Sequence, residues 1–219
     1  MRLIDRSEPT PDENLAVDES LLAACQAAES RHERSACAQP VEVLRFWESA
    51  RPVVVLGRSG RVDRDVDAAA CARADVPVLR RVSGGGAVVL GPGCLNFSLI
   101  LSLNARPALR DVETSLRIVL STLARALPVE GLHVEPPADL CWRGDKVSGH
   151  AQYRTRDALL HHGTILYDMD LALMSALLTE PVRQPAYRAR RSHAAFVRNL
   201  PLTMDIIKQA VARAWDATG

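Results

Sequence analysis

Two stretches of the sequence combine residue types that could bind an activated anionic group. The first, RRVSGGGAVVLGPG (80–93), holds five of the chain's 12 glycines, directly after two arginines. Clustered glycines cost backbone conformational entropy on folding, so their concentration needs a compensating use. A loop of bare backbone lets a ligand come close to main-chain N–H groups, and Arg80 and Arg81 would add positive charge. The segment could therefore bind a phosphate or a carboxylate.

Two familiar phosphate-binding loops do not fit this segment. A Walker loop needs a lysine and a hydroxyl residue after its second glycine, whereas Pro92 and Gly93 follow Gly91. A dinucleotide-binding fingerprint needs a helix after the glycines, whereas CLNFSLILSL (94–103) has the pattern of a buried strand. A backbone anion loop and a plain glycine-rich turn with solvated arginines both stay open on these residues alone.

The second stretch is GDKVSGHAQ (144–152), followed by LLHHGT (159–164). Lys146 is one of two lysines among 27 lysine and arginine residues, and a compact ammonium suits a narrow site that a guanidinium does not fit. Small residues after it, such as Gly149, would let a ligand approach the strand. The alternative is that Lys146 lies at the tip of a hairpin and has no functional role. A metal site at His161 and His162 is disfavoured, because neighbours on a strand point to opposite faces.

Composition restricts the class of protein and its partners. At 219 residues the chain suits one domain with a sizeable core, and its net charge of +1 argues against a nucleic-acid partner. No apolar segment approaches the roughly 20 residues that cross a bilayer, and the polar start does not resemble a signal peptide. The five cysteines are scattered and never spaced C-x-x-C, which is typical of reduced thiols. We therefore expect a cytoplasmic protein with no membrane or nucleic-acid partner.

The hydrophobic periodicity predicts an α+β fold with a mixed, largely antiparallel sheet flanked by helices. Helices are expected at 14–30 (capped by Asn14), 63–74, 111–126, 170–178 and 203–217. Strands are expected at 41–47, 52–57, 76–81, 94–103 and 158–168, with a hairpin over 139–154 turned at Gly144 and Asp145.

Three blocks together resemble the lipoate–protein ligase family: RRVSGGGAV (80–88), DL with KVSGHAQ (139–152), and LHHGT (160–164). The upstream segments NLAVDESLL and RFWESARPVVVLGR are also similar to that family, and the resemblance covers about residues 14 to 200 in the right order. The wider group contains biotin–protein ligases and octanoyltransferases, with a fold related to class II aminoacyl-tRNA synthetases. The resemblance implies a single catalytic domain over 1–219 with no C-terminal accessory domain, and a separate chain could supply the accessory function.

The resemblance also implies roles for individual residues. Lys146 would be the catalytic lysine beside the acyl carbonyl and the phosphate. The nucleotide would contact Lys146, Asp139, Arg81, Gly86, Ala87, Val88 and Val89. The acyl pocket or its mouth would be lined by Arg80, Ser83, Gly84, Gly85, Gly149, His161, Gly163 and Thr164. Asp139 would hold a magnesium ion or poise the attacking amine. Leu90 departs from the family, which often has histidine there.

The implied reaction is ATP-dependent ligation. A carboxylate is a poor acyl donor, so ATP with Mg2+ would convert lipoate or octanoate to an acyl-adenylate. Lys146 would neutralise charge on the carboxylate and the α-phosphate, and then on the carbonyl as an amine attacks. The acceptor would be a lysine of a lipoyl carrier protein: a 2-oxoacid dehydrogenase lipoyl domain, a glycine cleavage H protein or an H-like lipoate-binding protein.

The alternative within the same group is an octanoyltransferase, which takes octanoyl from acyl carrier protein, or from another lipoyl carrier, through a cysteine thioester. The stretch where one transferase type carries that cysteine, EGLHVEPPAD (130–139), has none, and no cysteine follows Cys141. Cys94 and Cys141 are the candidates left, and both are interpreted as core residues. A non-catalytic lipoate binder and a biotin ligase are further alternatives, which the complete glycine run, Lys146 and the HHGT block disfavour.

The segment RQPAYRARRSHAAFVRNL (183–200) carries five arginines. Such a run is usually a solvated basic loop. The functional alternative is a mobile lid or a docking edge for an acidic carrier domain, where charge would speed encounter.

Overall fold

The computed structural model describes residues 1–30, 42–181 and 184–219. Its main sheet has seven strands in the order β1-β2-β6-β10-β9-β8-β7. These are β1 (Arg2–Asp5), β2 (Val43–Trp47), β6 (Cys94–Ser102), β7 (His133–Glu135), β8 (Asp139–Trp142), β9 (Asp145–Arg154) and β10 (Ala158–Leu166). Only β1 and β2 pair in parallel among them, so the expected mixed, largely antiparallel sheet is confirmed.

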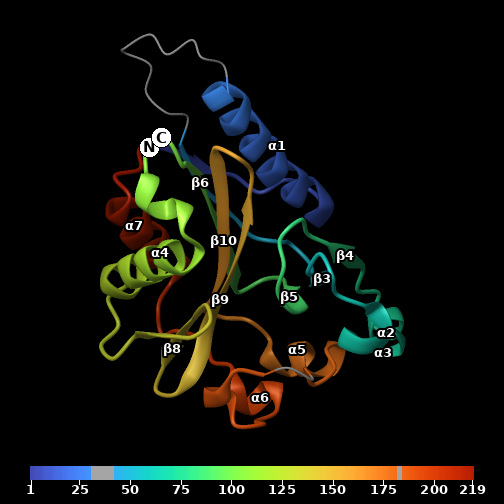
Figure 1. Cartoon of the computed structure of the whole chain (residues 1–219). Coiled ribbons are helices and arrows are strands. Elements are labelled where there is room, and N and C mark those ends of the chain that lie inside the picture. Colours follow the sequence, from blue (N-terminus) through green and yellow to red (C-terminus); the bar gives the residue numbers. More distant parts are fainter. Residues whose placement is uncertain (31–41, 182–183) are drawn as a thin grey trace.

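Helices cover both faces of this sheet. On one face α4 (Val112–Ala126) and α7 (Met204–Ala214) pack on the odd-numbered residues of β6 and β10, such as Leu99 and Leu159. On the other face α1 (Pro11–Ser30) packs on even-numbered residues such as Ile100 and Leu160. Figure 1 shows α1 on the side of the sheet away from α4 and α7. Because side chains alternate along a strand and both faces are covered, β6 is buried along its whole length, and β10 is buried except for the partly exposed His162 and Thr164.

A second sheet of three strands, in the order β4-β3-β5, carries the glycine segment between two of its strands. It is formed by β3 (Val53–Leu56), β4 (Val78–Arg80) and β5 (Val88–Leu90), with the short helices α2 (Val62–Asp65) and α3 (Ala68–Arg73) at its side. The helix expected at 63–74 is thus two helices, because the chain is extended at Val66 and Asp67 caps α3. Together with α5 (Leu171–Leu177) this sheet encloses a second core.

The first helix begins earlier than expected. Thr10 caps α1 in a reciprocal pair with Glu13, the Thr10 N–H donating to the Glu13 carboxylate at 3.0 Å. Asn14, expected as the cap, lies inside the helix and is buried. Its side-chain oxygen accepts a hydrogen bond from Arg45 at 2.6 Å, so it ties α1 to β2 instead.

Two further details position the site. The hairpin between β8 and β9 turns at Arg143 and Gly144, one residue before the expected position, since both have positive φ (54° and 82°) as such a two-residue turn requires. After β10 the chain passes through α5, the 3-10 turn η2 (Ala186–Arg188) and α6 (His193–Phe196) before α7. Another 3-10 turn, η1 (Pro107–Arg110), precedes α4. Of the helices described here, none is long and apolar enough to span a membrane.

Candidate active site

Two adjoining cavities lie between the glycine segment, β9 and β10. The inner cavity, of about 150 Å³, extends under the three-stranded sheet toward α1. The outer cavity, of about 320 Å³, lies between the glycine segment and the chain around η2 and α6. Eight residues line both: Gly85, Gly86, Ala87, Val88, Lys146, Gly149, His150 and Thr164. The glycine segment and the stretch around Lys146, which the sequence singled out as possible binding residues, thus meet at the junction of the cavities.

The glycine segment presents a run of free backbone donors at this junction. No described residue accepts a hydrogen bond from the N–H groups of residues 84–87. Gly85 has φ +93°, a conformation that L side chains rarely adopt. Successive unpaired N–H groups in such a loop form a concave site for an anion.

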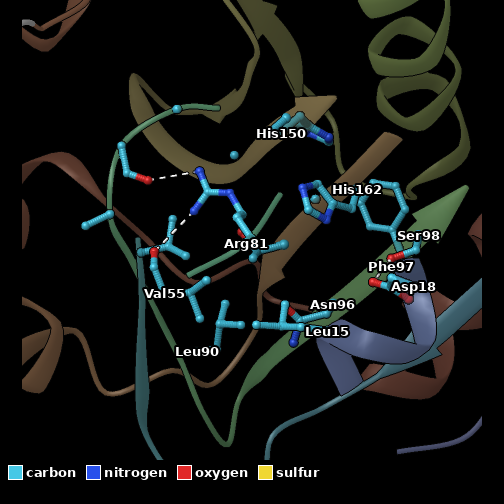
Figure 2. A pocket seen from close by; sticks show the side chains of 18 of the residues that line it. Leu15, Asp18, Val55, Arg81, Leu90, Asn96, Phe97, Ser98, His150 and His162 are labelled. Carbon is cyan, nitrogen blue, oxygen red and sulfur yellow. Dashed lines mark hydrogen bonds between the residues drawn. The ribbon is translucent and has the colours of Figure 1, made fainter. Parts of the chain in front are cut away.

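Arg81 holds this loop from behind. Its guanidinium donates to the carbonyls of Gly84 at 2.7 Å, Gly86 at 2.9 Å and Val55 at 3.1 Å, and its Nε donates to Ser83 at 3.0 Å. Figure 2 shows the hydrogen bond from Arg81 to Val55 at the wall of the inner cavity. Burial lowers the pKa of Arg81 to about 10, so the group stays charged at neutral pH. Burial is the one cause of this shift, with no contribution from a described carboxylate, so Arg81 also supplies uncompensated positive potential.

Arg80 lies outside both cavities, contrary to the expectation that it lines the acyl pocket. Its Nη1 donates to the carbonyls of Gly57 at 2.9 Å, Arg58 at 3.0 Å and Gly60 at 2.8 Å, which fixes the turn after β3. An added Cβ on Gly57 would lie 2.1 Å from the Gly85 carbonyl oxygen, so this turn packs directly on the glycine loop.

Lys146 lines both cavities and is oriented by a buried carboxylate. Its Nζ lies 2.7 Å from Oδ1 of Asp139, and Oδ2 of Asp139 accepts a hydrogen bond from the Tyr187 hydroxyl at 2.5 Å. Burial, and then the hydrogen bond to Asp139 and its charge, raise the pKa of Tyr187 far above its ordinary value. The tyrosine therefore stays protonated, and the lysine is directed by a carboxylate that is itself held in place.

Lys146 faces the junction because the β8–β9 ladder is irregular. Leu140 pairs with Ser148 but Cys141 pairs with Lys146, so β9 accommodates one extra residue at this point. In a regular strand residues 146 and 149 would point to opposite faces. Here an added Cβ on Gly149 would lie 2.9 Å from both Cε and Nζ of Lys146. Glycine at 149 therefore leaves the space that the lysine side chain occupies.

The two adjacent histidines point in different directions, as expected for neighbours on a strand. His162 lines the inner cavity (Figure 2). Its Nε2 lies 2.6 Å from the Ser83 hydroxyl. Burial and the nearby Arg81 lower the pKa of His162 to about 3, so the ring is neutral. His161, which the resemblance placed in the acyl pocket, lies on the opposite face, fully buried and stacked on Phe97.

The described cysteines are buried and do not line either cavity. Burial raises the pKa of the Cys94 thiol to about 12 and that of Cys141 to about 11. A nucleophilic cysteine needs the opposite shift. Cys37 lies outside the described residues.

A match to a protein-family model agrees with this geometry. Residues 10–215 match the model described as "Lipoyl protein ligase A/B catalytic domain". The chain belongs to this family.

Individual relatives carry two different names. A probable lipoate-protein ligase A of Mycoplasma pneumoniae is 31% identical over 165 residues, which are 75% of this chain and 45% of that protein. The chain thus spans under half the length of this relative. An octanoyltransferase LipM of Carboxydothermus hydrogenoformans is 32% identical over 210 residues, covering 87% of this chain and 74% of that protein.

Solved structures of lipoate ligases share the fold. Lipoate-protein ligase A bound with ATP superposes with a TM-score of 0.74 at 22% identity, covering 98% of this chain and 83% of that one. The bi-partite lipoate protein ligase of Thermoplasma acidophilum gives 0.71 at 22% identity, with 99% and 84% covered. Both parts of the fold, the seven-stranded sheet and the three-stranded sheet, are therefore those of the lipoyl ligase catalytic domain.

Most residues that the lipoyl ligase resemblance assigned meet at the cavities. At least one cavity is lined by Arg81, Gly85, Gly86, Ala87, Val88, Val89, Asp139, Lys146, Gly149, Gly163 and Thr164. Neither is lined by Arg80, Ser83, Gly84 or His161, whose polar groups or backbone lie behind the lining.

The surroundings of Asp139 do not form a resident metal site. Both of its carboxylate oxygens already bind donors, and the described residues contain no group of three or more histidine, cysteine, aspartate or glutamate side chains suited to a metal ion. A Mg2+ ion that accompanies ATP is commonly held by phosphate oxygens and water with few protein ligands. The protein-held magnesium expected at Asp139 is therefore not supported by its environment.

The floor of the inner cavity was not anticipated. Asn96 and Ser98 on β6 line it together with Asp18 on α1 (Figure 2). Oδ1 of Asp18 accepts from Arg45 at 2.8 Å, and Oδ2 accepts from Ser98 at 2.6 Å, so the buried carboxylate is paired. A signal existed in the sequence, because Asn96 and Ser98 lie two residues apart in the mostly apolar segment 94–103 and must share one face of a strand.

Proposed function

We propose that the chain is an ATP-dependent lipoyl ligase of the lipoyl ligase A/B family. It would convert lipoate or octanoate to an acyl-adenylate and transfer the acyl group to a lysine of a lipoyl carrier protein. One observation carries the proposal: Lys146 and residues 85–87, whose N–H groups are free, line the junction of an inner cavity suited to an acyl chain and an outer cavity suited to a nucleotide.

The first step places negative charge at the junction. A carboxylate oxygen attacks the α-phosphorus, a P–O bond forms, and pyrophosphate leaves with its electron pair. Lys146 would offset the charge of both reacting groups, and the backbone donors would bind the phosphate oxygens without side-chain bulk. The positive potential of Arg81 behind the loop adds to this attraction.

In the second step the amine of the acceptor lysine attacks the acyl carbonyl. A C–N bond forms, the C–O bond to phosphate breaks, and AMP leaves while the amine loses a proton. Negative charge builds on the carbonyl oxygen, which the same ammonium of Lys146 would stabilise. The bi-partite lipoate protein ligase of T. acidophilum was solved with its E2 lipoyl domain, which supports a lipoyl domain as the carrier and a separate accessory chain as an option.

The chemistry of the described thiols favours the ligase over the transferase. A transferase needs a reactive cysteine at the acyl site, and the described cysteines are buried with raised pKa values and lie away from both cavities. The match to an octanoyltransferase LipM keeps that reaction as the competing function.

The test is a mass measurement on a lipoyl domain. The protein is incubated with the lipoyl domain and either lipoate, ATP and Mg2+, or octanoyl acyl carrier protein without ATP. A mass increase that requires ATP is the expected result, whereas modification from the thioester alone would establish the transferase and overturn the ligase.

Alanine substitutions of the two lysines of the chain give a variant at the site and a matched control. Lys146→Ala should lower adenylate formation by about 10²- to 10³-fold, the loss typical of removing one charge-stabilising group. Lys208→Ala, which removes only a contact with Asp5 at 2.7 Å on the surface, should leave the rate unchanged. Equal rates in the two variants would contradict the role of Lys146.

A further inference from the structure

A chain of hydrogen bonds runs along one face of the main sheet, from the end of β9 near η1 and α4 to the wall of the cavities. It runs from Arg154 through Gln152, His161 and His150 to Ser148, and its members lie on β9 and β10. The successive distances are 2.7, 3.0, 3.2 and 2.9 Å. The proposed reaction uses none of these groups directly.

One end of the chain fixes the direction of its protons. Arginine only donates, so Gln152 must turn its Oε1 toward Nη2 of Arg154 and its NH2 group toward His161. Nδ1 of His161 is therefore an acceptor, and the proton of this neutral ring lies on Nε2, facing Nδ1 of His150.

The hydrogen bonds of Ser148, at the other end of the chain of hydrogen bonds, independently require the same proton positions. The Ser148 hydroxyl donates to the backbone carbonyl of Thr164, which can only accept. The Ser148 oxygen is then free to accept from Nε2 of His150, whose Nδ1 accepts from His161. Both ends thus require the Nε2–H tautomer in both rings.

The surrounding charges oppose protonation of either ring. A proton on Nδ1 of His150 would face the N–H of His161. Burial, then Lys146 and His162, lower the pKa of His150 to about 3. Burial, then His150, His162 and Arg154, lower the pKa of His161 well below its ordinary value. The neighbours from β6 and α4 are uncharged, namely Phe97 and Ser115.

This chain of hydrogen bonds ends at Ser148, next to the part of β9 that positions Lys146. Ser148 belongs to the irregular β8–β9 pairing that turns Lys146 toward the junction, and it bonds both β10 and His150. His150 lines both cavities, and an added Cβ on Gly163 would lie 2.6 Å from its Nδ1, so the ring fills the space beside that glycine.

We propose that Arg154, Gln152 and His161 are positioning residues that hold His150 as the neutral Nε2–H tautomer, so that no second positive charge forms beside Lys146 and the irregular turn of β9 keeps its shape. The charge state of the wall is set from the far end of β9, near η1 and α4. The catalytic part of this inference rests on the proposed function, whereas the tautomers do not.

The direct test is nitrogen-15 NMR of the whole protein labelled at histidine. Long-range 1H–15N correlations distinguish Nε2–H, Nδ1–H and imidazolium. Both rings should show the Nε2–H pattern unchanged between pH 5 and 8, with assignments from His150→Gln and His161→Phe. A Nδ1–H or imidazolium pattern for either ring at pH 7 in the unmodified protein would overturn the inference.

Gln152→Glu tests the relay by an isosteric change. A carboxylate only accepts, so His161 should acquire a proton on Nδ1, and an imidazolium signal should appear below pH 6. The kcat of adenylate formation should fall about tenfold with little change in the KM for ATP, because Lys146 is displaced. It should fall further at low pH, because the imidazolium repels the Lys146 ammonium. Gln209→Glu, an exposed glutamine on α7, is the control and should change neither readout.

These experiments distinguish a failure of the hydrogen-bond relay from a failure of the proposed function. If Gln152→Glu folds with His161 still carrying its proton on Nε2 alone, the relay is wrong. If it does not fold, the spectrum of the unmodified protein decides. Expected tautomers in a protein without ATP-dependent ligation would overturn the proposed function and leave the tautomer assignment standing.

Discussion

The guanidinium groups of Arg80 and Arg81 bind backbone carbonyls, three each, around the glycine loop. A guanidinium has five donors and no acceptor, so it is as well suited to collecting carbonyls as to binding an anion. By engaging the carbonyls of Gly84 and Gly86, Arg81 leaves the neighbouring N–H groups for a ligand. Arginines beside a glycine run can therefore build an anion site without touching the anion.

A glycine pair tests this loop. Gly85→Ala should strain a residue with φ +93° and place a methyl group 2.9 Å from Nη2 of Arg81. We expect a stability loss of about 1–2 kcal/mol and an increase in the KM for ATP of about tenfold, measured by urea unfolding and pyrophosphate exchange. Gly131→Ala has a comparable φ of +78° with no atom within 4 Å and lies outside both cavities. It should lose similar stability while its KM stays unchanged; parallel KM changes would count against the loop as the phosphate site.

Among the elements, the segment from η2 to α6 caps the outer cavity through its arginines. Arg191 donates to Oδ1 of Asp145 at 2.7 Å and to the Gly144 carbonyl at 2.8 Å, and Arg198 donates to Oδ2 of Asp145 at 2.7 Å. Arg188 is buried against Glu180. Arg191 and Arg198 hold the cap on the β8–β9 turn, whereas Arg190 is exposed. The run is therefore not a plain solvated loop, and its use in docking a carrier stays a prediction. Arg183 lies outside the described residues.

The two neighbouring arginines of the cap separate its possible uses. Arg191→Ser should loosen the cap and slow adenylate formation and carrier modification together, by several-fold. Arg190→Ser, at an exposed position, should have little effect on adenylate formation. Rates measured by pyrophosphate exchange and by the mass of the lipoyl domain decide the matter. If instead Arg191→Ser slowed carrier modification alone, the arginine would serve docking.

For the whole molecule, the buried neutral histidines predict sensitivity to acid. The pKa is lowered to about 3 for His150 and His162, and well below 6.5 for His161. A depressed histidine pKa means that the unfolded chain binds more protons, so the stabilisation is complete above about pH 6.5 and is lost as the pH falls toward 3.

The expected loss can be measured by urea unfolding at pH 7.5 and 5.5. Each of the three histidines should contribute about 1.4 kcal/mol to the decrease, or roughly 4 kcal/mol in all, against a typical domain stability of about 5–15 kcal/mol. His161→Phe should reduce the pH-dependent part by about a third. A free energy of unfolding that does not change over this interval would show that these rings are solvated or charged.

The fold class and the two reactive stretches followed from the sequence by itself. Strand and helix periodicity are local, and the apolar runs at 94–103 and 111–126 leave few alternatives. The order of the RRVSGGG, KVSG and HHGT blocks indicated the lipoyl ligase family, which the family match over residues 10–215 confirmed. Strand β1 and the break near Val66 were missed, because they depend on pairing with segments distant in the sequence. The cap at Thr10 was missed although its partner Glu13 lies only three residues away, so this signal was present in the sequence.

Only the tertiary structure decided which way the side chains of the site point. The irregular pairing of β8 with β9 reverses the face that Lys146 would occupy by simple alternation, and a shift of one residue in pairing is invisible in composition or periodicity. The distinction between His161 and His162, and between Arg81 as a loop holder and as a ligand contact, also depends on which acceptors lie nearby in space. The type of a residue determines which bonds its side chain can make. The partners that folding brings together determine which bonds it does make.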